Sequence, residues 1–575
     1  REREFDDFAR QPLLPYRLSR LGPGVACADV DGDGDDDFYL GGAAGQSGML
    51  FLHEPAGRFR LSPQPAFEAD AACEDMGVLF FDVDGNGTQD LYVVSGGVEG
   101  EPGEPQFRDR LYLNDGQGKF RKANDRLPDF RSSGSCVAAA DFDRDGDLDL
   151  FVGSRSVPGK YPLLPVNHLL RNAGSHFTDV TDSWAAALRK TGMVTSALWS
   201  DADGDGWIDL LVAHDWGPVR LFVNRHGRLE DQTREAGLDS LTGWWNGIAA
   251  GDVNGDGHID YVVTNLGRNT QYRASPQYPA LLLAGEFAEP GQRQLIEATW
   301  EEQRLVPIVG RNLLARTLPF LLERYPTQQS FGAAMIPDML PADSLRKAGR
   351  LEATTLESGV LINNGQGRFD FRPLPRLAQA APSYGVALAD VNGDGKLDLY
   401  LAQNFLSVQP ETGRMNGGVS LLLRGHGDGT FAPVWPKESG LMIPDDAKGL
   451  AVTDLNDDGW PDFLVGINNG EPRAFVNRGS QVNRLLAVRL RGKAGNPTAI
   501  GSRVTVRLAD SSTRTAEVQA GSGYLSQSSA ALAFGLGSTN QATQVQITWT
   551  DGSKIVNSLV PGQTSVEFMQ SVPQP

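Results

Sequence analysis

The segment DFDRDGDLDLFVGS, residues 141–154, joins a loop with an aspartate at every second position to a run typical of a β-strand. The pattern within it is D-x-[DN]-x-[DN]-G-x-x-D. It occurs seven times, with first residues at Asp29, Asp82, Asp141, Asp201, Asp252, Asp390 and Asp454. Self-similarity at a spacing of tens of residues indicates one supersecondary unit used repeatedly. The sequence is therefore best read as a series of such units.

The flanks of each copy repeat as regularly as the copy itself. A small, apolar run such as GVLFFD (77–82) comes before, and an alternating run such as DLYVVSGG (90–97) follows. A hairpin with turn glycines comes next, as in RLYLNDGQGKF (110–120). Branched and aromatic residues in short runs favour strands, so each unit is predicted to hold four of them.

Four-stranded units in series predict an all-β fold, a seven-bladed β-propeller, over residues 1–480. One interval, from Asp252 to Asp390, is 138 residues (390−252) and is long enough to hold an insertion, placed at 266–358 and expected to be partly helical. If that stretch holds a degenerate blade, the propeller has eight. Residues 481–575 read as about six short alternating strands, hence a C-terminal β-sandwich.

Closure of the ring needs an outer strand for the last unit, because an open propeller would expose two sheet edges. The N-terminal EFDDFARQPLLP resembles other outer strands in its acidic centre. We therefore expect the segment from Phe5 to Phe8 to pair with the strand near Phe475.

The spacing of the repeated loop suits calcium. Ca²⁺ takes six to eight oxygens, and a loop of this kind offers side chains at positions 1, 3, 5 and 9, a carbonyl at position 7, and glycine at position 6 for the sharp turn. An EF-hand would continue into a helix, whereas each copy here continues into a strand. The expected ligand positions in the seven loops are Asp29, Asp31, Asp33, Asp35 and Asp37; Asp82, Asp84, Asn86, Thr88 and Asp90; Asp141, Asp143, Asp145, Asp147 and Asp149; Asp201, Asp203, Asp205, Trp207 and Asp209; Asp252, Asn254, Asp256, His258 and Asp260; Asp390, Asn392, Asp394, Lys396 and Asp398; and Asp454, Asn456, Asp458, Trp460 and Asp462.

The net charge agrees with that prediction. The chain has a formal charge of −20, and seven Ca²⁺ would add +14 and leave −6, an ordinary value for a soluble protein. An acidic chain is a poor ligand for nucleic acid, which needs basic surface. No run reaches the roughly 18 apolar residues of a membrane span.

These residues resemble a known family. The loops with their strand flanks are similar to the FG-GAP or VCBS repeats of integrin α-chain propellers. The terminal motifs resemble the ASPIC/UnbV domain of the cartilage acidic protein family: NRLLAVRLRG from Asn483, AIGSRVTVRL from Ala499 and VQAGSGYLSQSS from Val518. The resemblance implies a secreted, periplasmic or surface-exposed calcium-binding protein with adhesion or assembly roles, and it brings no catalytic residues. GSGYLSQSS is either a recognition loop or a structural hairpin.

The insertion holds the candidate ligand contacts. Polar and aromatic residues gather at its start, and from them we select Arg268, Asn269, Tyr272 and Arg273. The helical spacing around Leu313–Leu322 predicts helices that cover one mouth of the propeller. The alternative is that the four side chains only fix the insertion to the blades.

Two functions of different classes follow. The first is a noncatalytic calcium-binding scaffold that binds an extracellular protein or glycan. The second is a calcium-dependent enzyme or lectin that acts on polysaccharide in the propeller funnel. The sequence has no GxSxG, HExxH or GxxxxGK[ST] motif, which favours the first. Cys27, Cys73 and Cys136 form no CxxC pair and are expected to be buried thiols. The start at Arg1 suggests a chain processed or excised from a longer precursor, part of a larger assembly.

Overall fold

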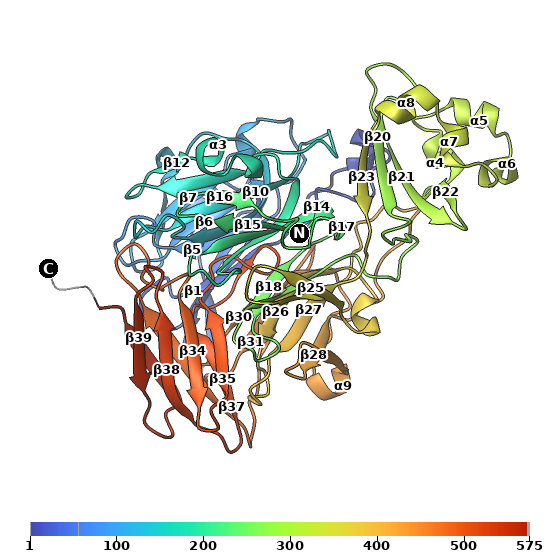
Figure 1. Ribbon diagram of the computed structural model, residues 1–575. Coiled ribbons are helices and arrows are strands. Elements are labelled where there is room, and N and C mark those ends of the chain that lie inside the picture. The colour runs from blue at the N-terminus through green and yellow to red at the C-terminus, as the bar shows by residue number, and fades with distance from the viewer. Residues whose placement is uncertain (1, 56, 572–575) are drawn as a thin grey trace.

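The computed structural model describes residues 2–55 and 57–571. These residues form an all-β protein whose sheets mostly have four strands. The strands pair antiparallel except for β40 with β33 and β36 with β1. Figure 1 shows the sheets grouped in one body, with one group of strands extending from its lower end and a second from its upper end. The predicted fold class is confirmed at this level.

Each acidic loop connects the first two strands of a sheet, and each sheet is named here after its first strand. The first four sheets consist of β1 (Val25–Ala28), β2 (Asp37–Leu40), β3 (Met49–Glu54) and β4 (Arg58–Ser62); β5 (Glu74–Phe81), β6 (Asp90–Gly96), β7 (Arg110–Asn114) and β8 (Phe120–Lys122); β9 (Ser133–Ala140), β10 (Asp149–Ser156), β11 (His168–Asn172) and β12 (Phe177–Asp179); and β13 (Met193–Ser200), β14 (Asp209–Pro218), β15 (Arg220–Asn224) and β16 (Leu229–Asp231), with β17 (Thr242–Trp244) paired to β14.

Three more sheets of the same kind follow along the chain. They consist of β18 (Ile248–Gly251), β19 (Asp260–Val263), β24 (Gly359–Asn363) and β25 (Phe369–Pro373); β26 (Ser383–Ala389), β27 (Asp398–Gln403), β28 (Leu421–Gly425) and β29 (Phe431–Val434); and β30 (Ala447–Thr453), β31 (Asp462–Ile467) and β32 (Arg473–Phe475).

The first strands of these sheets contact one another in a cycle. Each packs on the next, in the order β1, β5, β9, β13, β18, β26 and β30, and β30 returns to β1. Their small, apolar residues allow this close approach: β5 and β9 are buried along their whole length. Cys27 and Cys136 lie on such strands, and both are buried free thiols, as is Cys73, which confirms that prediction.

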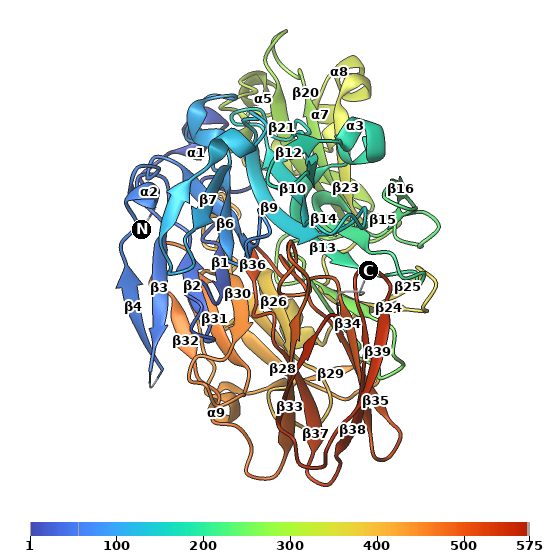
Figure 2. The same ribbon diagram turned by 90° about the vertical axis from the view of Figure 1, so that its left-hand side faces the viewer.

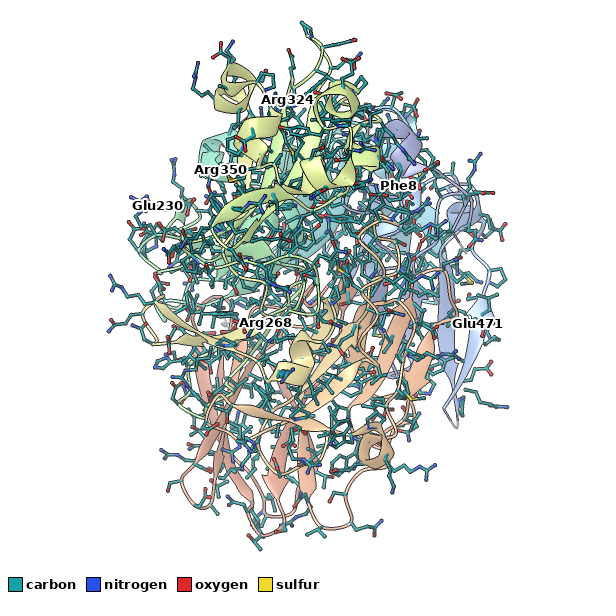
Figure 3. All side chains as sticks on the ribbon, turned by 90° about the vertical axis from the view of Figure 1, so that its right-hand side faces the viewer. Phe8, Glu230, Arg268, Arg324, Arg350 and Glu471 are labelled. Carbon is teal, nitrogen blue, oxygen red and sulfur yellow. The ribbon has the colours of Figure 1, made fainter. Side chains whose placement is uncertain are left out.

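The predicted role of the N-terminal segment is wrong. In the described part of the chain the β30 sheet ends at β32, and Phe5 to Phe8 adds no strand to it. The segment forms α1 (Asp7–Arg10) instead, because Asp6 caps that helix by accepting from the N–H groups of Phe8 and Ala9. In Figure 3, Phe8 lies toward the upper end of the molecule, well above Glu471 in the turn before β32. Glu2 bonds to Asn468 and Asn469, in the turn between β31 and β32.

The insertion contains more strand than predicted. It forms a separate four-stranded sheet in the order β22-β21-β20-β23, with short helices over its outer part: β20 (Ala280–Gly285), β21 (Gln294–Glu301), β22 (Arg304–Pro307), β23 (Gly349–Ala353), α4 (Arg311–Leu314), α5 (Phe320–Arg324), α6 (Gln328–Gly332), α7 (Ile336–Met339) and α8 (Ala342–Lys347). The helices expected around Leu313–Leu322 are confirmed. Strand β23 contacts β14 and β17, while β18 and β26 contact each other directly, so this sheet stands outside the cycle.

The remaining helices are short connections at the sheet ends. They are α2 (Pro65–Glu68), α3 (Thr181–Trp184), α9 (Pro436–Ser439) and the 3₁₀ turns η1 (Pro105–Phe107), η2 (Asn124–Arg126), η3 (Ala186–Leu188) and η4 (Arg376–Gln379). Within residues 2–55 and 57–571, we find no helix with the length and apolar character needed to cross a membrane.

The C-terminal strands form two sheets at the end opposite the insertion (Figures 1 and 2). One has the order β37-β33-β40 and the other β35-β34-β38-β39: β33 (Arg484–Arg491), β34 (Arg503–Leu508), β35 (Thr513–Glu517), β37 (Leu532–Gly537), β38 (Ala542–Thr548), β39 (Lys554–Ser558) and β40 (Ser565–Met569). Val504, Val506, Val545 and Ile547 are fully buried, whereas alternate residues face outward, as expected of strands covered on one face.

One loop of the C-terminal strands enters the centre of the cycle. This central loop, residues 518–529, contains β36 (Ser526–Gln527), which pairs in parallel with β1. Its backbone and side chains bond to Val25 of β1, Phe80 of β5, Ala139 of β9, Ser196 of β13, Ile248 of β18 and Val452 of β30. Tyr524 is 1% exposed, and its hydroxyl donates to the Leu21 carbonyl at 3.1 Å. Of the two roles predicted for GSGYLSQSS, these contacts favour the structural one.

Candidate metal centre

The first acidic loop shows how the backbone aims its carboxylates. Asp29 accepts from the N–H groups of Gly32 and Gly34, at 2.7 and 3.1 Å. Asp37, at position 9, accepts from Val30 in the loop and from His53 in β3, at 2.9 and 2.7 Å. Each carboxylate oxygen accepts one of these bonds, which fixes the orientation of the carboxylate and leaves lone pairs free to bind a cation.

The structure brings the predicted carboxylates together in the first four loops. In each of these, three carboxylates offer oxygens within 4.8 Å of one another: Asp29, Asp31 and Asp33; Asp82, Asp84 and Asp90; Asp141, Asp143 and Asp149; and Asp201, Asp203 and Asp209. Like charges at this separation repel strongly in a partly buried site unless a cation compensates them.

Across the seven loops, several side-chain oxygens at predicted ligand positions are buried without a hydrogen-bond partner among the described residues. They are Oδ1 of Asp31, Asp84, Asp141, Asp201 and Asn456, and Oδ2 of Asp149 and Asp398, all at predicted ligand positions. Leaving a buried carboxylate oxygen unpaired is costly. All donors in the set are hard oxygens, which fits Ca²⁺.

Burial also opposes ionisation of the same groups. It raises the pKa of Asp37, Asp90, Asp141, Asp260 and Asp398 to about 7, against backbone N–H donors that lower it in each loop. In Asp141 the Asp145 and Asp143 carboxylates add to the effect of burial. A divalent cation at the loop centre would reverse the balance and favour the charged forms.

Positions 5 and 7 are linked in every loop. The N–H group of residue 7 donates to the side chain of residue 5, as Trp207 does to Asp205 at 2.8 Å. The equivalent donors are Asp35, Thr88, Asp147, His258, Lys396 and Trp460. In two loops an arginine pairs with positions 3 and 5: Arg171 with Asp143 and Asp145, and Arg225 with Asp203 and Asp205.

The last three loops have asparagine at position 3. Asn254 and Asn456 each donate to the aspartate at position 5, at 2.9 and 3.0 Å, and Asn392 accepts from the Asp394 N–H at 2.8 Å. An amide oxygen is neutral, so the repulsion among the remaining carboxylates is smaller than in a loop with aspartate there. The carboxylates at positions 1 and 9 keep the backbone donors seen in the first loop.

A repeated asparagine, which the sequence reasoning missed, connects neighbouring sheets. It ends the third strand of four sheets and lies two residues beyond the third strand of the β30 sheet. Its N–H donates to the position 9 aspartate of its own loop, and its side-chain amide donates to the position 2 carbonyl of the preceding loop. We call this side-chain bond the asparagine latch. The amides and the carbonyls that accept from them are Asn114 and Val30, Asn172 and Val83, Asn224 and Phe142, Asn363 and Ala202, and Asn477 and Val391. The signal was present in RLYLN, HLLRN and RLFVN, each of which ends in asparagine.

The C-terminal strands pack on the face that carries the acidic loops. Arg489 donates to the Gly34 carbonyl and Arg503 to the Gly257 carbonyl, both at 2.6 Å, and Asn483 donates to Asn392 at 3.0 Å. A cleft of about 890 Å³ remains between these strands and the loops that begin at Asp252, Asp390 and Asp454. The position of the C-terminal strands therefore depends on the conformation of the acidic loops.

The four side chains proposed as ligand contacts make intramolecular contacts. Arg268 pairs with Glu357 at 3.3 Å, and Asn269 donates to the Ala380 carbonyl at 3.0 Å. Arg273 donates to the carbonyls of Thr270 and Tyr272. Tyr272 is 4% exposed and packs on Trp244. Figure 3 shows Arg268 below the insertion, apart from Arg324 and Arg350 within it. A ligand role for these residues stays a prediction.

Tyr272 is hydrogen-bonded to Glu297, a buried carboxyl group that should make the stability of the protein depend on pH. The tyrosine hydroxyl donates to Glu297 Oε1 at 2.6 Å, which lowers the pKa of Glu297. Burial, with the Asp215 carboxylate, outweighs this bond and raises that pKa to about 8. The folded state then holds a proton that the unfolded state, with a pKa of about 4.3, releases. Wild-type stability is consequently lost as pH rises from about 4.3 to about 8, by about 1.4 kcal/mol per pH unit.

Glu297→Gln keeps the acceptor and cannot ionise, so we expect the variant to lose this component of the pH dependence. Urea denaturation of both proteins at pH 6, 7 and 8 in saturating Ca²⁺ measures it. Parallel curves for wild type and variant would contradict the assignment.

Comparisons with known proteins match both the repeats and the terminal strands. The model of the FG-GAP-like repeat matches residues 29–93, 99–152, 201–263 and 355–401, and the ASPIC and UnbV model matches residues 492–574. The chain is therefore a protein of FG-GAP repeats with a C-terminal ASPIC and UnbV domain.

Among individual proteins, the chain is similar to cartilage acidic protein 1. It is 23% identical to the Homo sapiens protein over 580 residues, which cover 95% of this chain and 71% of that protein. For the Mus musculus protein, the identity is also 23%, over 576 residues, with 94% and 72% covered. The similarity thus extends through both the repeats and the terminal domain.

Solved structures also match, at low identity. A structure of an Agrocybe aegerita lectin that recognises non-reducing terminal N-acetylglucosamine has a TM-score of 0.38 and 15% identity, over 79% of this chain and 94% of that chain. A complex of BBS1N with ARL6DN has a TM-score of 0.37 and 10% identity, over 80% of this chain and 94% of that chain.

Proposed function

We propose that the protein is an extracellular or cell-surface calcium-binding scaffold for protein binding, adhesion or assembly. Seven loops, one in each sheet of the cycle, bind Ca²⁺ through side chains at positions 1, 3, 5 and 9 and the carbonyl at position 7. The observation that carries the proposal is the set of buried oxygens at ligand positions that have no hydrogen-bond partner in the part of the chain that the structure describes. Bound Ca²⁺ orders the face on which the C-terminal strands sit.

The architecture within this proposal is a closed, seven-bladed propeller of residues 1–480, with the insertion 266–358 outside the ring, and a sandwich of residues 481–575, of which 572–575 lie outside the described residues. The cyclic contact of the first strands supports closure. Direct contact between β18 and β26 favours seven blades over eight.

The proposed compartment follows from calcium affinity. We assign the loops dissociation constants of about 10⁻⁴–10⁻³ M, the range of extracellular calcium-binding modules. Such sites fill only where free Ca²⁺ is near millimolar. The similarity to cartilage acidic protein 1 supports the same class of protein. We propose an extracellular protein or glycan as the partner.

The enzyme or lectin alternative required an open funnel at the centre of the ring. That position is taken by Tyr524, which packs on Tyr384 with ring centroids 5.1 Å apart and accepts from Arg155 at 3.3 Å. Tyr384, Arg155 and Tyr524 are all buried. The central side chains therefore give no support to a polysaccharide site there.

Asp141→Ala tests a single loop. The variant should bind one Ca²⁺ fewer per chain than the wild type and lose roughly 1.4 kcal/mol at 1 mM Ca²⁺, because each site contributes RT ln(1 + [Ca²⁺]/Kd). Equilibrium dialysis gives the stoichiometry and urea denaturation the stability. The matched control is Asp147→Ala, since only the carbonyl of residue 147 is proposed as a ligand. An equal loss in both variants, or in neither, would refute the loop assignment.

A further inference from the structure

The contact between the β1 and β30 sheets differs from the other contacts in the cycle. The third strand of the β1 sheet has His53 where five other sheets have the latch asparagine. His53 keeps the backbone part of the arrangement, because its N–H donates to Asp37 at 2.7 Å. Its imidazole, however, replaces the amide that would reach the neighbouring loop.

The facing loop is also unusual. Its fourth residue is Asp457, with a φ of 60°, where five of the other loops have glycine. Aspartate enters this left-handed region at a cost of roughly 1 kcal/mol relative to glycine. A carboxylate is therefore held at a position where the repeat otherwise favours glycine.

The His53 ring is buried and, among the described residues, makes no hydrogen bond. The residue is 4% exposed. The ring stacks on Phe59, with centroids 4.7 Å apart and planes 11° apart, which fixes its orientation. Nδ1 lies 3.8 Å from Oδ1 of Asp457, too far for a hydrogen bond.

A second carboxylate completes the group. Asp35, from the first acidic loop, offers a carboxylate oxygen within 4.8 Å of a ring nitrogen of His53 and of a carboxylate oxygen of Asp457. Burial and then the Asp35 carboxylate raise the pKa of Asp457. Two ligands at about 2.1 Å from one tetrahedral ion stand about 3.4 Å apart, close to the observed 3.8 Å.

We propose that Asp35, His53 and Asp457 form a binding site for a divalent transition-metal ion of the Zn²⁺ type between the β1 and β30 sheets. One imidazole nitrogen with two carboxylates is a ligand set for such an ion, whereas the acidic loops offer oxygen alone. The ion connects the first sheet to the last by coordination, at one of the two contacts without the asparagine latch; at the other, the β26 sheet has Gly425 in that position. Asp35 and Asp457 belong to the first and last acidic loops, but their side chains are not among the proposed calcium ligands, because the first loop uses only the carbonyl of Asp35.

The test uses the tag-free full chain in saturating Ca²⁺, with Co²⁺ as a spectroscopic probe and Zn²⁺ in calorimetry. The wild type should bind one Zn²⁺ per chain and develop the visible absorption of tetrahedral Co²⁺, which Zn²⁺ displaces. His53→Asn restores the asparagine that the other sheets use, and Asp457→Gly restores the common glycine, so both variants should fold.

Both variants should lose the Co²⁺ band and more than about 100-fold in Zn²⁺ affinity, since changes to outer-shell partners alone cost about 10–100-fold. His426→Asn, at an exposed histidine, is the matched control and should behave as the wild type. A wild type without the Co²⁺ band, or variants that retain it, would overturn the proposal and leave His53 as an ion-pair partner of the two carboxylates.

Discussion

Removal of calcium with EGTA is expected to lower the melting temperature of the full chain by about 10 °C or more. A site that exists only in the folded state adds its binding free energy to folding. With a dissociation constant of about 10⁻⁴ M and about 1 mM free Ca²⁺, each loop contributes roughly 1.4 kcal/mol. Seven loops contribute roughly 10 kcal/mol, comparable to the total stability of an ordinary domain.

The effect should be specific to the ion. Ca²⁺ in excess of the chelator should restore the melting temperature, and an equal concentration of Mg²⁺ should not, because Mg²⁺ requires shorter bonds and octahedral geometry and gives up water reluctantly. Differential scanning calorimetry of the three states measures this. Equal melting temperatures with and without Ca²⁺ would mean that the acidic loops are ordinary turns.

Tyr524→Ala should be the most destabilising single substitution in the central loop. The side chain is 1% exposed, packs on Tyr384, donates to the Leu21 carbonyl and accepts from Arg155. Truncation of a buried aromatic costs about 3–5 kcal/mol, and here it also deprives a buried guanidinium of a partner. We expect a loss in that range in urea denaturation.

Tyr524→Phe is the matched control. It keeps the ring and removes two hydrogen bonds, so we expect a loss of about 1–2 kcal/mol. If Tyr524→Ala is no worse than Tyr524→Phe, the ring of Tyr524 does not support the centre of the cycle, and the central loop is only a surface hairpin.

The repeat made most of the architecture predictable. The acidic loops mark the junction of first and second strands, and the structure has a sheet at each of them. Strand pairing inside a repeat is local, so turn glycines and alternating residues define it. The ligand positions were also predictable, because each set lies within nine consecutive residues.

Features that depend on contacts between distant segments could not be predicted from the sequence. The acidic N-terminal segment resembles an outer strand in composition, yet Asp7 is buried and accepts from Leu18, Ser19 and the Ser19 hydroxyl, which favours a helix with a folded-back chain. The central loop reaches the ring through long-range contacts, and its own residues show no periodicity that would predict them. The partnership of His53 with Asp457 joins residues about 400 positions apart, and each looks ordinary in its own repeat.

The most direct measurement of the central claim is the number of calcium ions bound to the intact chain. Native mass spectrometry of the full protein, first stripped with EGTA and then exchanged into buffer with 1 mM Ca²⁺, resolves each added ion by mass. The proposed ligand loops predict up to seven Ca²⁺ per chain, one fewer in Asp141→Ala, and an unchanged number in Asp147→Ala. A chain that binds no calcium under these conditions would contradict the proposed function.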